Sequence, residues 1–195
     1  MTFSWQSALS MLIVLPLLGA CGDKRSANAD NFQRALQDYF GTHPECGALP
    51  IDLSFDAPIS ANDPHRRQLE AMTGVGLLSA TPASAAGATQ YSVTAAGNAA
   101  IRKGDDPFLG GMSLCYAHRR VVKVTSFTAP ADALGIKMSR VTYQYDLRDI
   151  VPWSKAEAVQ EAFPQIKASL AAQNQTDTEP MVLTSEGWVD EHVIH

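Results

Sequence analysis

Charged side chains are absent from the first 20 residues of this 195-residue chain. Within that segment, an apolar run over residues 8–20 contains Pro16 and ends in small residues. A helix that crosses a bilayer needs about 20 apolar residues, so this run is too short for a membrane span, and Pro16 would kink it. A short N-terminal apolar run of this kind is typical of a secretory signal peptide. The sequence therefore predicts a signal peptide over residues 1–20.

Signatures of catalysis are also missing. The chain has no G-x-S-x-G turn for a serine nucleophile and no H-E-x-x-H helix for a catalytic zinc ion. Asp105 and Asp106 do not have the spacing of a calcium-binding EF-hand loop, and no glycine-rich phosphate-binding sequence is present. We therefore expect a protein that is not an enzyme, has no catalytic residues and needs no cofactor.

Basic residues are scarce. The chain has 15 Lys and Arg against 20 Asp and Glu, which gives a net charge of −5 at pH 7. Contacts between basic side chains and phosphates dominate the affinity of proteins for nucleic acid. The charge balance therefore predicts that nucleic acid is not a partner of this protein.

A lone cysteine stands directly after the apolar run, in the string Leu18-Gly19-Ala20-Cys21. This pattern of Leu, two small residues and Cys resembles the lipobox of bacterial lipoproteins, although no Lys or Arg precedes the run here. The resemblance implies that the signal is cut before Cys21, whose sulfur then receives a diacylglycerol and whose freed amine is acylated. Two or more acyl chains anchor a protein stably to a membrane. The membrane is thus the expected partner of the N-terminus.

The residues just after Cys21 indicate in which membrane the protein is located. Gly22 comes next, and Asp23 stands one position later. In Gram-negative lipoproteins an Asp directly after the lipidated cysteine retains the protein in the inner membrane, so the resemblance implies the outer membrane, facing the periplasm. We expect residues 21–29 to be a flexible tether. The expected function is a non-enzymatic binding or scaffolding role in the cell envelope, for a partner or ligand that the sequence does not identify.

Two further cysteines, Cys46 and Cys115, remain after the lipobox. In an oxidising periplasm they are expected to form a disulfide. Because it would reduce the conformational entropy of the unfolded chain, this bond should stabilise the fold by about 4 kcal/mol. An alternative is a metal site, or the centre of a hydrolase, because His43 stands three residues before Cys46 and His118 three residues after Cys115. Both interpretations place residue 46 next to residue 115.

Apolar spacing predicts an α+β fold in which helices pack on small antiparallel sheets. The first lobe is expected over residues 30–104. It begins with a helix capped by Asn28 or Asp30 and ended by Gly41, and then continues into a strand over residues 49–55. One face of that helix is apolar and consists of Phe32, Leu36, Tyr39 and Phe40.

Residues 63–97 resemble the end of a winged-helix domain. The resemblance rests on Gly76-Leu77-Leu78 at the end of a helix and on the string Tyr91-Ser92-Val93-Thr94-Ala95-Ala96-Gly97. Asp63 is the expected N-cap of the first helix and Thr94 that of the second. The resemblance adds nucleic-acid binding as a weaker alternative function. It is disfavoured because the segment between the two helices has no Lys or Arg.

The second lobe is expected over residues 105–195. Alternating apolar residues predict two antiparallel strands, over residues 115–128 and 139–149, joined by a mobile loop. A helix should come next, with a capping box at Ser154 and Glu157 and a break at Pro164. The remaining segments are predicted as a polar loop over 174–180 and a final hairpin that turns at 185–187.

Four aromatic residues of this lobe have two interpretations: they could line a ligand groove, but large aromatic side chains in helices and strands are more often part of the core. They are Tyr143, Tyr145, Trp153 and Trp188.

Overall fold

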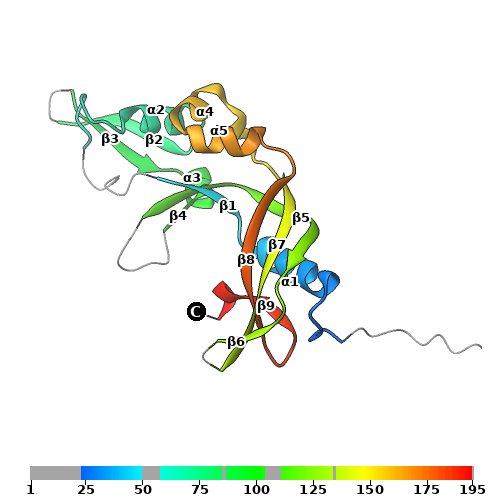
Figure 1. The fold of residues 1–195 in the computed structure, drawn as a ribbon. Coiled ribbons are helices and arrows are strands. Elements are labelled where there is room, and N and C mark those ends of the chain that lie inside the picture. The colour runs from blue at the N-terminus through cyan, green and yellow to red at the C-terminus, as the bar shows by residue number, and fades with distance from the viewer. Residues whose placement is uncertain (1–22, 50–57, 85–86, 104–110, 134, 195) are drawn as a thin grey trace, which may run out of the picture.

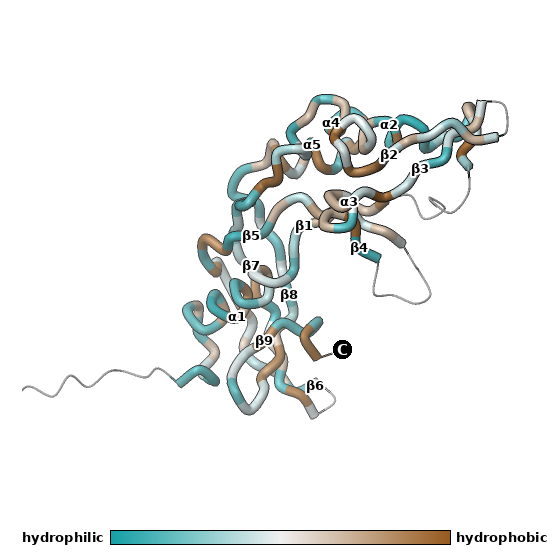
Figure 2. Tube along the Cα trace, turned by 180° about the vertical axis from the view of Figure 1, so that it is seen from behind, coloured by the Kyte–Doolittle hydropathy of each residue, from teal (hydrophilic) through white to brown (hydrophobic). Residues whose placement is uncertain are grey.

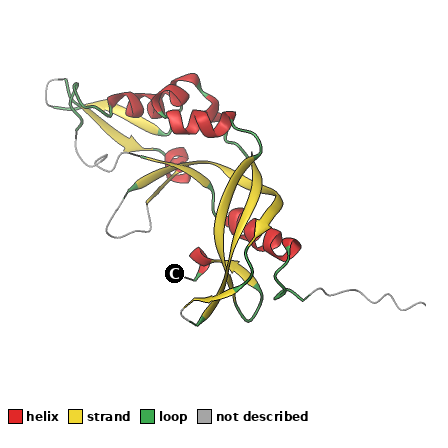
Figure 3. Ribbon diagram, viewed as in Figure 1, coloured by secondary structure: helices red, strands yellow, loops and turns green. Residues whose placement is uncertain are grey.

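The computed structural model describes residues 23–49, 58–84, 87–103, 111–133 and 135–194. Helices and antiparallel sheets are mixed along the chain, which confirms the α+β class (Figures 1 and 3). The predicted signal over residues 1–20, Cys21 and most of the strand predicted over 49–55 lie outside the described residues, as do Asp105 and Asp106. Within the described part, every helix is too short or too polar to cross a membrane.

A seven-stranded antiparallel sheet organises the molecule. Its main order is β1-β5-β7-β8-β9, with β4 paired to β5 and β6 paired to β7. The strands are β1 (Glu45–Ala48), β4 (Ile101–Lys103), β5 (Met112–Phe127), β6 (Ala131–Ala133), β7 (Ile136–Arg148), β8 (Gln175–Leu183) and β9 (Trp188–Asp190). The first part of β5 pairs with β1 and β4 and the second part with β7, so one long strand runs through both halves of the molecule (Figure 1).

Two hydrophobic clusters lie along this strand. The first, which we call the distal cluster, joins Leu69, Leu77 and Leu114 to residues of the helices α4 (Glu157–Ala162) and α5 (Pro164–Ala171). Hydrophobic residues recur along α4 and α5 between hydrophilic ones (Figure 2). The second, the proximal cluster, packs the helix α1 (Ala29–Thr42) against β5, β7, β8 and β9. The clusters therefore do not follow the boundary predicted at residues 104–105: α1 packs with the second half of the chain, and α4 and α5 pack with the first.

The predicted apolar face of α1 is buried. Phe32 and Leu36 have no exposed surface, and Phe40 is nearly as buried. Each such side chain stabilises the fold by about 1.5–3 kcal/mol. Asn28 caps the helix as predicted, since its side-chain oxygen accepts a hydrogen bond from the backbone N–H of Asn31 at 2.9 Å. The helix continues past Gly41 to Thr42.

The segment predicted from the winged-helix resemblance contains α2 (Arg66–Gly74), β2 (Leu78–Pro82), β3 (Thr89–Val93) and α3 (Ala95–Ala100). β2 and β3 form an antiparallel hairpin, and Thr94 caps α3 by accepting from the N–H of Gly97 at 3.0 Å. The Asp63 cap is wrong. Its carboxylate accepts from the N–H of His65 at 2.8 Å, which forms a turn, and the helix starts only at Arg66. The winged-helix resemblance itself stays a prediction.

Two segments predicted as loops are strands. The linker over residues 129–138 contains β6, which pairs with β7, and the polar segment over residues 174–180 lies largely in β8, which pairs with β7 along eight residue pairs. Asp, Glu and Pro are poor strand formers, which is why the polar segment was predicted as a loop. Pairing with β7 overrides this preference; for example, the Thr142 and Thr178 hydroxyls hydrogen-bond across the strands at 2.9 Å.

The capping box at Ser154 and Glu157 is also wrong. Ser154 is buried in the short 3-10 helix η1 (Pro152–Lys155), and its hydroxyl donates to the carbonyl of Val151 at 2.7 Å. Ala156 therefore stands at the N-cap of α4. The break at Pro164 is confirmed, because this residue starts α5. So is the final hairpin: the N–H of Thr184 donates to the carbonyl of Gly187 at 2.8 Å.

Candidate functional site

The predicted disulfide between Cys46 and Cys115 is present. Antiparallel pairing of β1 and β5 sets the two cysteines directly opposite each other, and their sulfurs are bonded. The bond links positions 69 residues apart. A loop of that length corresponds to about 4 kcal/mol of stabilisation in the chain-entropy account.

The disulfide removes the thiolates on which the alternative metal site of His43, Cys46, Cys115 and His118 depended. Each histidine has another partner. Nδ1 of His43 hydrogen-bonds to the carbonyl of Tyr39 at 2.9 Å, and Nδ1 of His118 to that of Phe40 at 3.0 Å. These carbonyls belong to the last turn of α1, where the helix itself leaves carbonyls without N–H donors. The Tyr39 carbonyl also accepts the backbone N–H of His43 at 3.0 Å. The two histidines thus complete the C-terminal end of α1.

Next to this end of α1 lies Arg119, a half-buried arginine on β5. Its guanidinium donates to Glu45 at 2.6 Å, to Asp177 at 2.7 Å and to the Tyr143 hydroxyl at 2.8 Å. The ring of Tyr145 stacks on it at 4.4 Å. Burial lowers the pKa of Arg119, but its carboxylate partners raise this pKa by more, so the charge is permanent.

A cleft of about 290 Å³ opens beside Arg119. It lies between the end of α1, the start of β1, β8 and the short C-terminal helix η2 (Glu191–Val193). Its lining residues are Tyr39, Phe40, His43, Pro44, Glu45, Cys46, Arg119, Glu179 and His192. The cleft therefore combines aromatic walls with a group of ionisable side chains.

Negative charge is in surplus around the cleft. We define the acidic cluster as Glu45, Asp177, Glu179 and Asp190. The first three lie within 4 Å of the guanidinium of Arg119, and Asp190 is a neighbour of Glu179. Burial raises the pKa of Glu179, and the neighbouring carboxylates of Asp190 and Asp177 raise it further, while Arg119 lowers it. Carboxylates gathered in this way favour a cationic ligand.

Asp190 and His192 form a hydrogen-bonded pair at the edge of the acidic cluster. Oδ1 of the fully buried Asp190 accepts from the backbone N–H of His192 at 3.0 Å and from its Nδ1 at 2.8 Å. This bond raises the pKa of His192, against a smaller opposing effect of burial. The imidazole therefore lies beside the Asp190 carboxylate at the mouth of the cleft.

The N-terminal segment over residues 23–28 is fastened to the domain at a separate place. Asn31, nearly buried, donates from Nδ2 to the carbonyls of Asp23 at 2.8 Å and Ser26 at 2.9 Å. Nε1 of Trp188 donates to the carbonyl of Arg25 at 3.1 Å. The described part of the predicted tether is therefore folded against α1 and β9.

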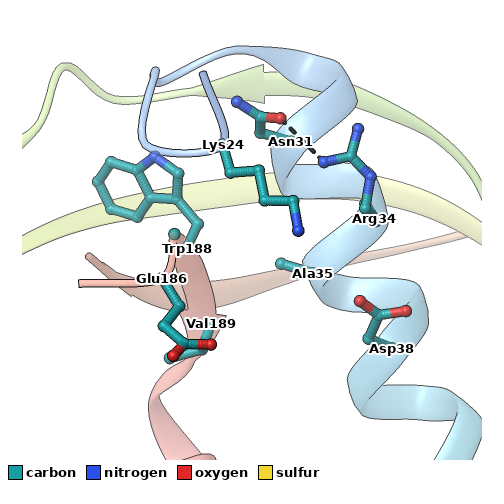
Figure 4. A pocket seen from close by; sticks show the side chains of 9 residues that line it. Lys24, Asn31, Arg34, Ala35, Asp38, Glu186, Trp188 and Val189 are labelled. Atoms are coloured by element: carbon teal, nitrogen blue, oxygen red, sulfur yellow. Dashed lines mark hydrogen bonds between the residues drawn. The ribbon is translucent and has the colours of Figure 1, made fainter. Parts of the chain in front are cut away.

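A small cavity of about 170 Å³ marks where this segment meets the hairpin between β8 and β9 (Figure 4). Gly187 of the hairpin comes so close that a Cβ there would lie 3.1 Å from the carbonyl oxygen of Lys24. Charges of both signs surround the cavity, from Lys24, Arg34, Asp38 and Glu186. The contact between the segment and the hairpin is tight.

The four aromatic residues lie mainly in the hydrophobic clusters, in line with the core interpretation. Tyr143, Tyr145 and Trp188 are buried in the proximal cluster, and Trp153 packs at the edge of the distal one. Trp188 also lines the cavity of Figure 4.

Comparison with known proteins identifies no relative: no family model, no curated protein and no solved structure matches the chain.

No local pattern in the sequence marks the residues of the acidic cluster as a site. Glu45, Asp177, Glu179 and Asp190 come from β1, β8 and β9, and only the sheet brings them to Arg119. One signal was present in the sequence: Arg119 stands near Cys115, and Glu45 precedes Cys46, so the predicted disulfide already implied that these two charges are neighbours.

Proposed function

We propose that this chain is a lipid-anchored protein of the bacterial cell envelope with a non-enzymatic binding role. It is attached through Cys21 to the outer membrane and faces the periplasm. The disulfide between Cys46 and Cys115 supports this proposal, because such bonds persist in oxidising compartments. The acidic cluster beside the cleft supports a binding role, because its surplus of carboxylates suits a cationic group.

The short distance along the chain between the lipobox and the fold decides where a lipid anchor would place the domain. Asp23, two residues after Cys21, already accepts the first hydrogen bond from Asn31. A lipid on Cys21 would therefore hold the folded domain directly at the membrane surface, at the end where the hairpin of β8 and β9 meets residues 23–28. Lys24 and Arg25 lie in this segment and suit anionic lipid head groups.

Metabolic labelling with a palmitate analogue in a Gram-negative host tests the anchor. We expect the full chain to be labelled and to fractionate with membranes. The Cys21→Ala variant should lose the label and the membrane association together, and the Ser10→Ala variant, which keeps the lipobox, should behave as the wild type. An unlabelled wild-type protein, or a labelled Cys21→Ala variant, would overturn the proposal.

A further inference from the structure

We propose that Glu179, Asp190 and His192 form a binding site for one divalent transition-metal ion, with Zn²⁺ as the best match. Each residue offers one ligand atom, and the three atoms lie within 4.8 Å of one another. The site does not involve either cysteine, and it is independent of the lipid anchor.

The sheet and the C-terminal helix bring these three side chains together. Asp190, the last residue of β9, pairs with Met181 on β8. Glu179 precedes Met181 by two positions, so its side chain leaves β8 on the same face. His192 stands two positions after Asp190 in η2, and their hydrogen bond fixes the imidazole beside the carboxylate.

The buried carboxylate of Asp190 points most directly to a missing ligand. Its Oδ1 has two hydrogen bonds from His192, but its Oδ2 is buried and has no hydrogen-bond partner among the described residues. A buried acceptor without a partner costs about 1–3 kcal/mol, and more when it is charged. A bound cation would satisfy this oxygen.

The charges around the site also favour a cation. The guanidinium of Arg119 is engaged at short distance by Glu45 and Asp177, whereas it lies 3.9 Å from Glu179. Arg119 therefore compensates Glu179 only weakly. Burial raises the pKa of Glu179 and the neighbouring Asp190 raises it further, while Arg119 and His192 lower it, so the carboxylates of Glu179 and Asp190 repel each other. A divalent ion between them would neutralise this repulsion.

The site is accessible from the cleft. Glu179 and His192 line the cleft beside Arg119, and Asp190 lines a neighbouring cavity of about 300 Å³. The side chain of His192 is 57 % exposed, so it can exchange its hydrogen bond with Asp190 for a bond to the ion. A rearrangement of this kind is needed, because ligand atoms around a tetrahedral ion with bonds of about 2.0–2.1 Å lie roughly 3.3 Å apart.

The types of ligand select the metal. One imidazole nitrogen with two carboxylate oxygens matches the nitrogen and oxygen ligands of Zn²⁺, and three protein ligands leave a fourth position open. Ca²⁺ and Mg²⁺ prefer oxygen ligands alone and in larger number. The histidine therefore favours Zn²⁺ over these two ions.

Isothermal titration of the full chain with ZnCl₂, after chelator treatment and dialysis, tests this site. We expect one Zn²⁺ per chain. His192→Ala and Glu179→Gln should each weaken binding at least tenfold, while Asp38→Asn, in the neighbouring cavity but outside the three residues, should leave it unchanged. Circular dichroism would show that the variants are folded; His192→Ala is the safest, because its side chain is exposed.

Three results would overturn the proposal. The first is the absence of stoichiometric Zn²⁺ binding by the folded wild type. The second is wild-type affinity in both His192→Ala and Glu179→Gln. The third is loss of binding in His43→Ala but not in His192→Ala, which would place the ion elsewhere in the cleft. Binding of Ca²⁺ in preference to Zn²⁺ would likewise contradict the assigned metal.

Discussion

At the scale of single residues, Arg119 connects the aromatic core to the acidic cluster. Its guanidinium bonds to carboxylates from β1 and β8, and its flat faces lie over the rings of Phe40 and Tyr145. When either partner of a buried ion pair is removed, the charge that remains is left without compensation, and the folded state is destabilised. The contribution of Arg119 to stability can be measured by substitution, with the adjacent Arg120 as the control.

Arg119→Ala should lower the free energy of unfolding by about 3 kcal/mol, because it leaves the partly buried Glu45 and Asp177 without their cation. Arg120→Ala is the matched control. Arg120 is 62 % exposed and pairs with Asp146 at the surface, so its loss should cost less than about 1 kcal/mol. Urea unfolding measures both changes, and equal losses would refute the role assigned to Arg119.

Tyr143 should make the protein sensitive to alkali. Burial raises its pKa far above the usual value, although Arg119 lowers it. In the unfolded chain the phenol ionises near pH 10. Above that pH the unfolded state binds fewer protons than the folded state, so the free energy of unfolding falls as pH rises, by about 1.4 kcal/mol per pH unit for each such tyrosine.

Urea unfolding between pH 8 and pH 11 checks this prediction. The free energy of unfolding of the wild type should stay constant up to about pH 10 and then fall. That of Tyr143→Phe should fall less over the same interval. Buried Tyr145 and Tyr116, whose pKa values burial also raises, contribute the remaining slope. Identical slopes in the two proteins would contradict the assignment to Tyr143.

At the scale of elements, the sequence predicted what depends on local spacing. The apolar face of α1, its Asn28 cap and the restart at Pro164 were correct because neighbouring residues decide them. The first part of β8, over residues 175–180, was missed because Asp177 and Glu179 are polar, and their place in a strand depends on β7 and Arg119, far away in the sequence. The Ser154 cap failed because burial turned its hydroxyl toward Val151.

The candidate site follows the same division. The disulfide was predictable from the number of cysteines and the compartment, and it placed Glu45 near Arg119. The three proposed metal ligands were not predictable, because their meeting depends on the register of β8 and β9 and on the C-terminal turn.

The disulfide is the covalent link between β1 and β5. Cys46→Ala combined with Cys115→Ala should cost about 4 kcal/mol of unfolding free energy, since the unfolded chain regains the freedom of a long loop. Thermal unfolding with and without dithiothreitol measures the effect. Reductant should destabilise the wild type and leave the double variant unchanged; a wild type insensitive to reductant would contradict the assigned role.

The attachment of residues 23–28 to α1 depends on Asn31. Asn31→Ala removes the two hydrogen bonds to Asp23 and Ser26, so the segment should open more often, and trypsin should cut after Lys24 and Arg25 about tenfold faster. Asn98→Ala, an exposed change on α3, serves as the control. Equal cleavage rates in all three proteins would show that the segment is already free.

At the scale of the whole molecule, the distal and proximal clusters lie at opposite ends of the structure (Figure 1). The helices α2, α4 and α5 and the hairpin of β2 and β3 lie at one end, and the chain enters at the other, beside α1 and β9 (Figure 1). With the proposed lipid on Cys21, the proximal cluster lies at the membrane and the distal cluster extends into the periplasm. The acidic cleft then lies between the two.

The proposed location in the outer membrane can be tested by changing the residue that follows Cys21. Gly22→Asp places an aspartate directly after Cys21, the position that retains lipoproteins of Gram-negative bacteria in the inner membrane. The wild type should fractionate with the outer membrane and Gly22→Asp with the inner membrane, while Gly22→Ala should behave as the wild type. The same distribution for all three proteins would contradict the proposed address.

The most direct test of the account is the mass of the N-terminal tryptic peptide from protein extracted out of membranes. We predict a peptide that begins at Cys21, ends at Lys24 and is heavier than its sequence by one diacylglycerol and one acyl chain. A peptide that begins elsewhere, or an unmodified Cys21, would contradict the lipid anchor and with it the membrane-proximal placement of the fold.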